Sequence, residues 1–176
     1  NNVEWLHGFG SLKSKNVVQY TSEKGLIKNL STKNTLLASG SLPSKIQSLP
    51  IDNEYIFDSS GALEFKSVPK ELCIIGAGVI GLELGSVWRR LGSNVTVLEA
   101  QTSFLDTADK DVSAEALKLF KKQGLKIELG TLVTDAKIAK EKVTISYKKG
   151  AERLESSFDK VVVAVGRSPY TEGLNL

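Results

Sequence analysis

The stretch that decides the fold is ELCIIGAGVIGLELG, residues 71–85, in which an apolar run leads directly into closely spaced glycines. Residues 72–75 are continuously apolar, as is typical of a strand that is buried on both faces of a parallel sheet. The glycines follow as GxGxxG, and apolar side chains then recur at helical spacing as far as Leu91. Gly92 comes next and is a normal left-handed helix cap. The stretch therefore predicts a strand, a sharp turn and a helix in direct succession.

Each glycine of this turn has a separate physical reason. Gly76 stands where the chain leaves the strand, a position that can require a positive φ and exclude a Cβ atom. Gly78 lets the backbone approach a pyrophosphate, which the first N–H groups and the positive dipole end of the helix attract. Gly81 allows the helix to pack closely on the preceding strand. This order of elements predicts a dinucleotide site.

A carboxylate follows at the distance that such a site requires. Residues 94–99, NVTVLE, form a second apolar strand that ends at Glu99, about twenty residues beyond the glycines. An acid at this position accepts hydrogen bonds from the adenosine ribose hydroxyls. No Arg or Lys lies between Glu99 and Phe104, so nothing local favours a 2′-phosphate. The sequence thus predicts NAD rather than NADP; the alternative is a tight turn and an acid without a binding role.

The composition is that of an ordinary globular chain. The 176 residues are 41% hydrophobic and 24% charged, enough for one good core and too short for two large domains. Lysines are scattered along the chain, so the net charge of +3 does not indicate nucleic-acid binding. No apolar run reaches the length of a membrane span, and NNVEW is not a signal peptide. We therefore expect a soluble, cytoplasmic protein with no nucleic-acid or membrane partner.

The cysteine and histidine content predicts no metal site. Cys73 is the single cysteine, which excludes an internal disulfide and a CxxC motif, and it should serve as a small apolar residue of the buried strand. His7 is the single histidine and is expected to be a surface or structural residue. The chain contains no Met, which suggests that it is cut from a longer protein.

The chain before the glycine stretch should contain a small β unit and a linker. Residues 1–42 are predicted to form an antiparallel meander, and residues 43–59, rich in Ser and Pro, a linker. A short helix is expected over residues 59–65. The predicted strands of the meander are residues 3–6, 8–12, 16–20, 25–30 and 35–38.

The chain after Glu99 alternates between helical and strand patterns. A helix is predicted over residues 111–122, and a strand over residues 125–129. A last apolar strand, residues 160–165, ends at Gly166, on the carboxyl side of the sheet where ligands bind. Antiparallel strands are predicted between them, at residues 131–139, 142–147 and 152–158.

The order of three motifs resembles one enzyme family. ASGS at 38–41, GAGVIGLELGSVWRRLGSNVTVLE at 76–99 and AVGRSPYT at 164–171 are similar to the FAD- and NAD-dependent disulfide oxidoreductases, and within them to the dihydrolipoamide dehydrogenases. The resemblance implies an α/β fold. Residues 60–176 would be a Rossmann-type three-layer NAD-binding domain with a β-meander insertion, and residues 1–42 a small antiparallel β remnant of the FAD-binding domain.

The resemblance also implies roles for individual residues. Val133 would lie beside the adenine, and Gly166 near the nicotinamide ribose or carboxamide. Val79 would lie near the nicotinamide ring, and Glu83 close to the nicotinamide and the flavin. The alternative for Val79 and Val133 is ordinary packing, and for Glu83 a solvent-facing helix position. No catalytic residue is expected, and the predicted cofactor-binding set is Gly76, Ala77, Gly78, Val79, Ile80, Gly81, Glu83, Glu99, Val133 and Gly166.

Several elements of the family are missing from this sequence. It has no second GxGxxG for FAD, no CxxxxC redox pair, no downstream glycine-aspartate flavin element and no C-terminal His/Glu pair. Dithiol exchange requires two cysteines. We therefore expect this chain alone to bind NAD(H), to be monomeric and to lack activity, with FAD present only in the full-length parent.

The resemblance implies a redox enzyme as that parent. It would oxidise dihydrolipoamide and pass hydride from FAD to NAD⁺, as a homodimer within 2-oxoacid dehydrogenase or glycine cleavage complexes, in the cytoplasm or in the mitochondrial matrix of a eukaryote. The alternatives are another flavoprotein of the superfamily, such as an NADH oxidase or a transhydrogenase, and a non-catalytic NAD-sensing module.

Overall fold

The computed structural model describes residues 2–176, which fall into two compact units. The first unit comprises the described residues up to Leu42 together with Ser168–Leu176, and the second comprises Pro43–Arg167. The chain passes between the units in strands β4 (Ser41–Pro43) and β13 (Arg167–Pro169), which pair with each other. The C-terminal residues, expected within the nucleotide-binding domain, thus group with the first unit.

The first unit is built on a three-stranded antiparallel sheet. Its strands are β1 (Gly8–Ser14), β2 (Val17–Ser22) and β3 (Ile27–Ser31). The predicted strands at residues 3–6 and 35–38 are wrong, because these short apolar runs have no strand partner among the described residues. In the part of this unit before Leu42, no described residue is buried.

The second unit contains a five-stranded parallel sheet in the order β5-β12-β6-β7-β8. The bounds of its strands are Ile56–Asp58 for β5, Glu71–Ile75 for β6, Asn94–Leu98 for β7, Lys126–Glu128 for β8 and Lys160–Val163 for β12.

Strand β5 lies in the segment that composition predicted as a linker, so the prediction does not hold there. Ile56 and Phe57 are buried, and the Asp52 carboxylate fixes the turn before them by accepting bonds from the backbone N–H groups of residues 54–56. Burial alone would raise the pKa of Asp52, but these hydrogen bonds outweigh it and lower the pKa. Ser and Pro content did not reveal this short strand.

Two helices match the sequence patterns. Helix α1 (Val79–Leu91) ends at Gly92, whose φ of 114° is left-handed, as predicted. Helix α2 (Lys110–Lys122) begins after Asp109, whose side chain accepts bonds from the N–H groups of Asp111 and Val112. The short helix expected over residues 59–65 is a single 3₁₀ turn, η1 (Gly61–Leu63).

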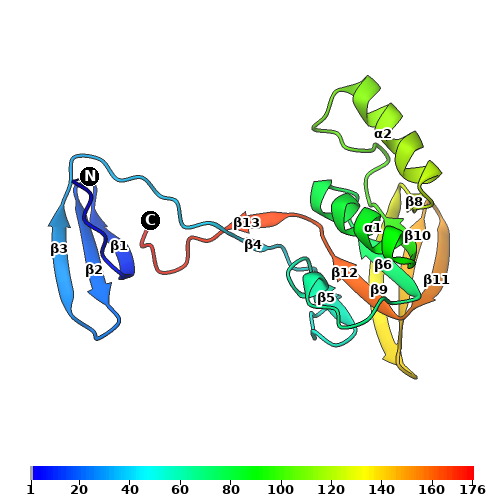
Figure 1. Cartoon of the computed structure of the whole chain (residues 1–176), viewed down its shortest axis with the longest axis horizontal. Helices are drawn as coiled ribbons and strands as arrows, with labels where there is room; N and C mark the ends of the chain where they lie inside the picture. Colours follow the sequence, from blue (N-terminus) through cyan, green and yellow to red (C-terminus); the bar gives the residue numbers. More distant parts are fainter. Residues whose placement is uncertain (1) are drawn as a thin grey trace. The chain divides into compact units, whose positions relative to one another are not determined.

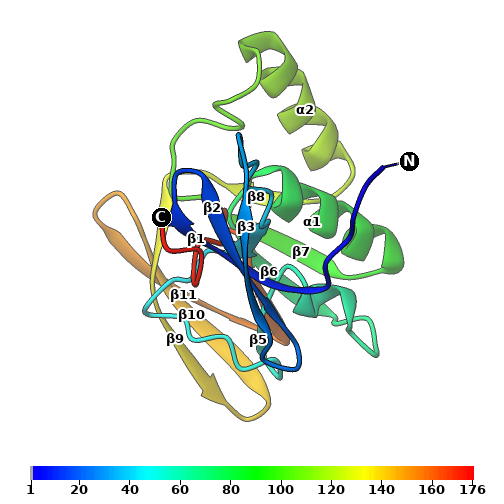
Figure 2. The same ribbon diagram turned by 90° about the vertical axis from the view of Figure 1, so that its left-hand side faces the viewer.

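A three-stranded antiparallel sheet completes the second unit, as the alternating pattern predicted. It consists of β9 (Thr131–Ala139), β10 (Lys142–Lys149) and β11 (Glu152–Phe158) in the order β11-β10-β9. Helices α1 and α2 lie on one side of the parallel sheet and strands β9–β11 on the other (Figures 1 and 2). The second unit therefore has three layers.

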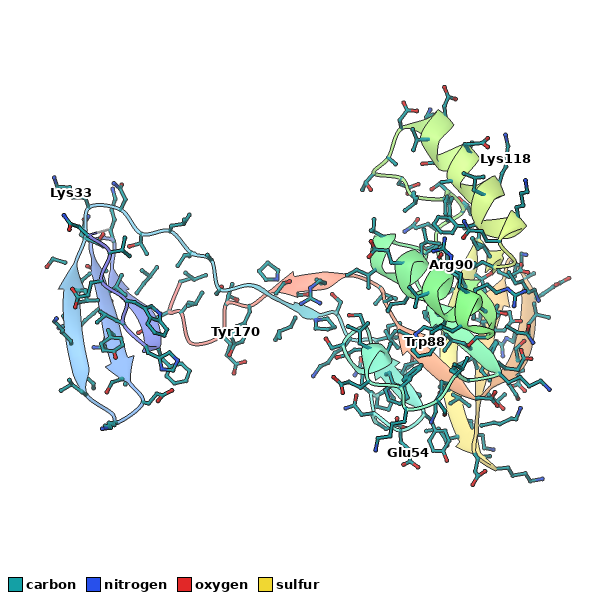
Figure 3. All side chains as sticks on the ribbon, in the orientation of Figure 1. Lys33, Glu54, Trp88, Arg90, Lys118 and Tyr170 are labelled. Carbon is teal, nitrogen blue, oxygen red and sulfur yellow. The ribbon has the colours of Figure 1, made fainter. Side chains whose placement is uncertain are left out.

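Hydrophobic cores fill the two spaces between these layers. Leu72 and Ile74 of β6 pack in the core on the helix side with Trp88 of α1, which Figure 3 labels. The alternate residues Cys73 and Ile75 pack in the core shared with β10 and β11. Complete burial raises the pKa of the Cys73 thiol, so this cysteine is an apolar core residue, as expected.

Candidate functional site

A cavity of about 610 Å³ lies at the carboxyl end of the parallel sheet in the second unit. This volume is in the range of small-molecule sites. The lining includes the last residues of β6, β7 and β12, which are Ile75, Leu98 and Val163. The lining residues are Pro43, Ile46, Ser59, Ile75, Gly76, Gly78, Val79, Ile80, Leu98, Glu99, Ala100, Gln101, Thr131, Leu132, Val133, Val163, Ala164, Val165 and Gly166.

The strand order explains why a cavity forms here. From β6 the chain proceeds to β7 and β8 on one side, whereas β12 pairs with β6 on the other side. The chain leaves the carboxyl end of β6 through α1 toward β7, whereas after β12, on the other side of β6, it leaves this sheet for β13. In open α/β sheets, ligands bind outside the carboxyl ends of the strands at such a switch point.

The glycines of the turn after β6 have different surroundings. Gly76 has a φ of +105°, and a Cβ atom there would lie 2.5 Å from the carbonyl oxygen of Ala164. A Cβ atom on Gly81 would lie 2.2 Å from the carbonyl oxygen of Gly76. At Gly78, by contrast, a Cβ atom would meet no described atom within 4 Å. Gly76 and Gly81 are thus required by packing, whereas Gly78 leaves open space at the cavity.

The N-terminus of α1 forms the wall of the cavity beside this turn. Gly78 is the N-cap residue and makes no side-chain cap, and it lines the cavity with Val79 and Ile80. The first N–H groups of a helix have no partner within the helix, and the dipole places positive potential there. This end of α1 is therefore suited to an anionic group.

Glu99 contributes a carboxylate that contacts the same turn and lines the same cavity. Its Oε2 atom accepts a hydrogen bond of 2.7 Å from the Ala77 N–H group, and its Oε1 atom one of 2.8 Å from the Gln101 N–H group. The Glu99 backbone is held as well, by bonds to Glu128 and Thr131. Both carboxylate oxygens are thus fixed at the edge of the cavity.

Val133 and Gly166 come from distant parts of the chain to the same cavity. Val133 belongs to β9 and is nearly buried, whereas Gly166 follows β12 with a φ of +125°. The Gly166 carbonyl accepts a 2.9 Å hydrogen bond from the Ser44 N–H group. The fold brings together seven of the predicted residues as lining: Gly76, Gly78, Val79, Ile80, Glu99, Val133 and Gly166.

The other three predicted residues do not line the cavity. Ala77 is buried, and its N–H group donates a hydrogen bond to the lining residue Glu99. Gly81 is buried where α1 packs on the rest of the unit. Glu83 is exposed on α1. Within this chain, Glu83 is therefore a surface residue of the helix.

Sequence reasoning missed the lining residues that come from the segment before β6 and from the start of β9. Pro43, Ile46 and Ser59 lie in the predicted linker, and Thr131 is almost completely buried beside Glu99. The only sequence signal was Ile46, an apolar residue among Ser and Pro. Its partners lie far away in sequence, so periodicity could not identify them.

In the described part of the chain, no three His, Cys, Asp or Glu side chains are grouped so that they could hold a metal ion. None of the helices described is long and apolar enough to cross a membrane. His7 is exposed and pairs with Glu23 at 3.2 Å, in agreement with a surface role.

Comparison with known proteins relates this geometry to a group of redox enzymes. The chain is 43% identical over 178 residues to dihydrolipoyl dehydrogenase 3 of Pseudomonas putida, covering 100% of this chain and 38% of that protein. It is also 43% identical over 180 residues to the mitochondrial dihydrolipoyl dehydrogenase of Dictyostelium discoideum, covering 100% of this chain and 37% of that protein. The chain thus spans little more than a third of the length of these relatives.

Solved structures show the same fold. The HOCl-induced flavoprotein disulfide reductase RclA from Escherichia coli superposes with a TM-score of 0.76 at 25% identity, covering 99% of this chain and 38% of that chain. LpdA from Mycobacterium tuberculosis superposes with a TM-score of 0.78 at 21% identity, covering 98% of this chain and 36% of that chain. The family model described as pyridine nucleotide-disulphide oxidoreductase matches residues 1–176. The chain therefore belongs to the pyridine nucleotide-disulphide oxidoreductase family.

Proposed function

We propose that the second unit contains a Rossmann-type NAD-binding domain and that NAD(H) binds in the cavity at the carboxyl end of its parallel sheet. One observation carries this proposal: the open face of Gly78, the N-terminus of α1 and the Glu99 carboxylate border a single cavity at the switch point of the sheet. The strand order β8-β7-β6-β12 supports the same assignment.

Each part of the cavity suits a different part of the dinucleotide. The pyrophosphate would lie against Gly78 and the start of α1, and the adenosine ribose would donate hydrogen bonds to Glu99. Val133 would contact the adenine, and the nicotinamide end would lie toward Gly166 and Val79. Bound NAD⁺ would supply the hydride-accepting chemistry, and these residues would position it.

The residues after β7 favour NAD over NADP. Glu99 is followed by Ala100, Gln101, Thr102 and Ser103, none of which carries a positive charge. A 2′-phosphate would therefore approach the Glu99 carboxylate with no neighbouring cation to compensate. We expect NADP⁺ to bind at least about tenfold more weakly than NAD⁺.

We further propose that the chain acts as the NAD-binding part of a dihydrolipoyl dehydrogenase. The relatives of that name support this, since they align with all of this chain. The longer enzyme would hold FAD, with residues 1–42 belonging to its FAD-binding domain, and would oxidise dihydrolipoamide. It would be a homodimer that serves 2-oxoacid dehydrogenase or glycine cleavage complexes in the cytoplasm or mitochondrial matrix. The present chain contains one cysteine and is expected to be inactive by itself.

The resemblance to RclA favours one second candidate, a flavoprotein disulfide reductase with a different electron acceptor. The two candidates share the nucleotide site and differ in the substrate of the longer enzyme. Rapid NADH formation from dihydrolipoamide by the longer enzyme would support the first candidate, and NADH oxidation without dihydrolipoamide turnover would support the second.

The nucleotide site itself can be tested with a pair of glycine variants. Gly78→Ala places a methyl group in the open space beside the helix terminus, at a backbone conformation that alanine adopts readily (φ −73°, ψ 176°). We expect its affinity for NADH, measured by fluorescence titration, to fall at least about tenfold because the pyrophosphate loses its close approach. Gly10→Ala in β1 is the control, because a Cβ atom there meets only Val18 at 3.8 Å. Equal NADH affinity in all three proteins would contradict the assigned site.

A further inference from the structure

We propose that Glu99 is a positioning residue for the glycine turn as well as an acceptor for the ribose. The inference rests on the proposed dinucleotide site. It starts from the bonds that the carboxylate already makes, since each oxygen accepts a backbone N–H group, from Ala77 at 2.7 Å and from Gln101 at 2.8 Å. Hydrogen bonds to an ionised acceptor are among the stronger ones in proteins. The Glu99 side chain therefore fixes backbone on both sides of itself.

The bond to Ala77 restrains the turn between its first two glycines. Ala77 lies between Gly76 and Gly78, and glycine backbones have the widest conformational freedom. The Gly76 N–H group donates to the Leu98 carbonyl at 2.8 Å, which fixes the turn at the strand side. The Glu99 carboxylate holds the next peptide group, directly before the N-cap of α1. It thereby holds Gly78 and the first N–H groups of α1 in the arrangement that the proposed pyrophosphate site requires, without the help of a ligand.

The backbone of Glu99 extends this restraint to the part of the cavity that β9 lines. Its N–H group donates to the Glu128 carbonyl at 2.9 Å, and its carbonyl accepts from the Thr131 N–H group at 2.7 Å. Thr131 begins β9, the strand that carries Val133. One residue thus links the proposed pyrophosphate turn to the proposed adenine wall. A preorganised site avoids the cost of ordering these segments on binding.

This role predicts that Glu99 affects ligands that have no ribose hydroxyls. The probe is 2′,3′-dideoxy-ADP, which keeps the pyrophosphate and lacks both hydroxyls, and ADP is the reference. Glu99→Gln and Glu99→Ala form a matched pair, because both remove the charge but only the glutamine retains an oxygen that can accept a backbone N–H bond. We expect Glu99→Gln to bind 2′,3′-dideoxy-ADP about 3- to 10-fold more tightly than Glu99→Ala. Equal affinity of the two variants for this probe would restrict Glu99 to ribose recognition and overturn the inference.

A second measurement needs no nucleotide. Amide hydrogen exchange followed by NMR should be at least about tenfold faster at Ala77 in Glu99→Ala than in the unmodified chain, because the amide loses its acceptor. Val162, buried in the central sheet, should exchange at an unchanged rate, which distinguishes local release from global unfolding. Unchanged exchange at Ala77 would overturn the inference. Faster exchange at Ala77 in a chain that binds neither ADP nor NAD⁺ would instead contradict the proposed function and support the effect of Glu99 on the turn.

Discussion

At the scale of the residue, two glycines of the turn have different roles, since Gly81 is required for packing and Gly78 is proposed to serve ligand binding. Gly81→Ala would place a Cβ atom 2.2 Å from the Gly76 carbonyl oxygen, against backbone that cannot move cheaply. We expect the free energy of unfolding to fall by about 1–3 kcal/mol, the usual cost of overpacking. Gly78→Ala, which meets no atom, should change it by less than about 0.5 kcal/mol. Urea denaturation of both variants checks this, and equal losses would contradict the division of roles.

Glu83 is a residue of α1 that is expected to take no part in NAD⁺ binding by this chain. It is exposed and does not line the cavity, so Glu83→Gln should leave the NAD⁺ affinity of this chain unchanged within about twofold. If Glu83 faces the nicotinamide and flavin of the longer enzyme, the same substitution should slow NADH formation there. Calorimetry on this chain and stopped-flow kinetics on the longer enzyme measure the two effects. Loss of NAD⁺ affinity in the chain alone would place Glu83 in the nucleotide site after all.

At the scale of the element, strong local sequence patterns predicted strands and helices correctly. Where the local pattern was weak, pairing with distant strands determined whether a strand formed. The apolar run, glycine turn and helix around residues 71–92 formed as expected because every local preference there agrees. Residues 3–6 and 35–38 have strand-like composition but find no partner strand, and β5 was missed because its burial depends on β12. Two of the glycines and Glu99 belong to a local sequence pattern, so their place in the cavity lining could be predicted. Ile46 and Thr131 reach the cavity only through the folding of distant segments, so theirs could not.

An ionised side chain helps to hold the start of β6. The Oδ2 atom of Asp159 accepts the Glu71 N–H group at 2.8 Å, and its Oδ1 atom lies 3.3 Å from the Lys142 ammonium. Burial alone would raise the pKa of Asp159, but these two partners outweigh it and lower the pKa below its ordinary 3.8. Since the pKa is depressed in the folded state, the stabilisation is present above the unfolded value and is lost as pH falls through the folded value.

Asp159→Asn tests this dependence with little change in shape. We expect it to lower the free energy of unfolding by about 1 kcal/mol at about pH 7, and the difference to shrink toward zero near pH 2, where aspartate is protonated. Asp135→Asn, at an exposed position of β9, is the charge-matched control. Chemical denaturation at the two pH values measures both variants. A difference of the same size at both would show that charge on Asp159 has no part in holding β6.

At the scale of the whole molecule, the layered packing lies within the second unit. Both hydrophobic cores are built from residues between Ile46 and Ala164, whereas the described residues before Leu42 contribute no buried side chain. We therefore expect residues 43–167 to unfold cooperatively when made alone, with a Tm within about 4 °C of that of the whole chain. Calorimetric unfolding provides the comparison, and a broad transition without a heat-absorption peak would contradict it.

The central claim is that the cavity at the carboxyl end of the parallel sheet is an NAD site. Isothermal titration of the chain with NAD⁺ and, separately, NADP⁺ tests it most directly. We predict saturable one-to-one binding of NAD⁺ and at least about tenfold weaker binding of NADP⁺, because Glu99 borders the cavity and none of the described lining residues is a Lys or Arg. NADP⁺ binding as tight as NAD⁺, or no binding of NAD⁺ at millimolar concentration, would contradict the claim.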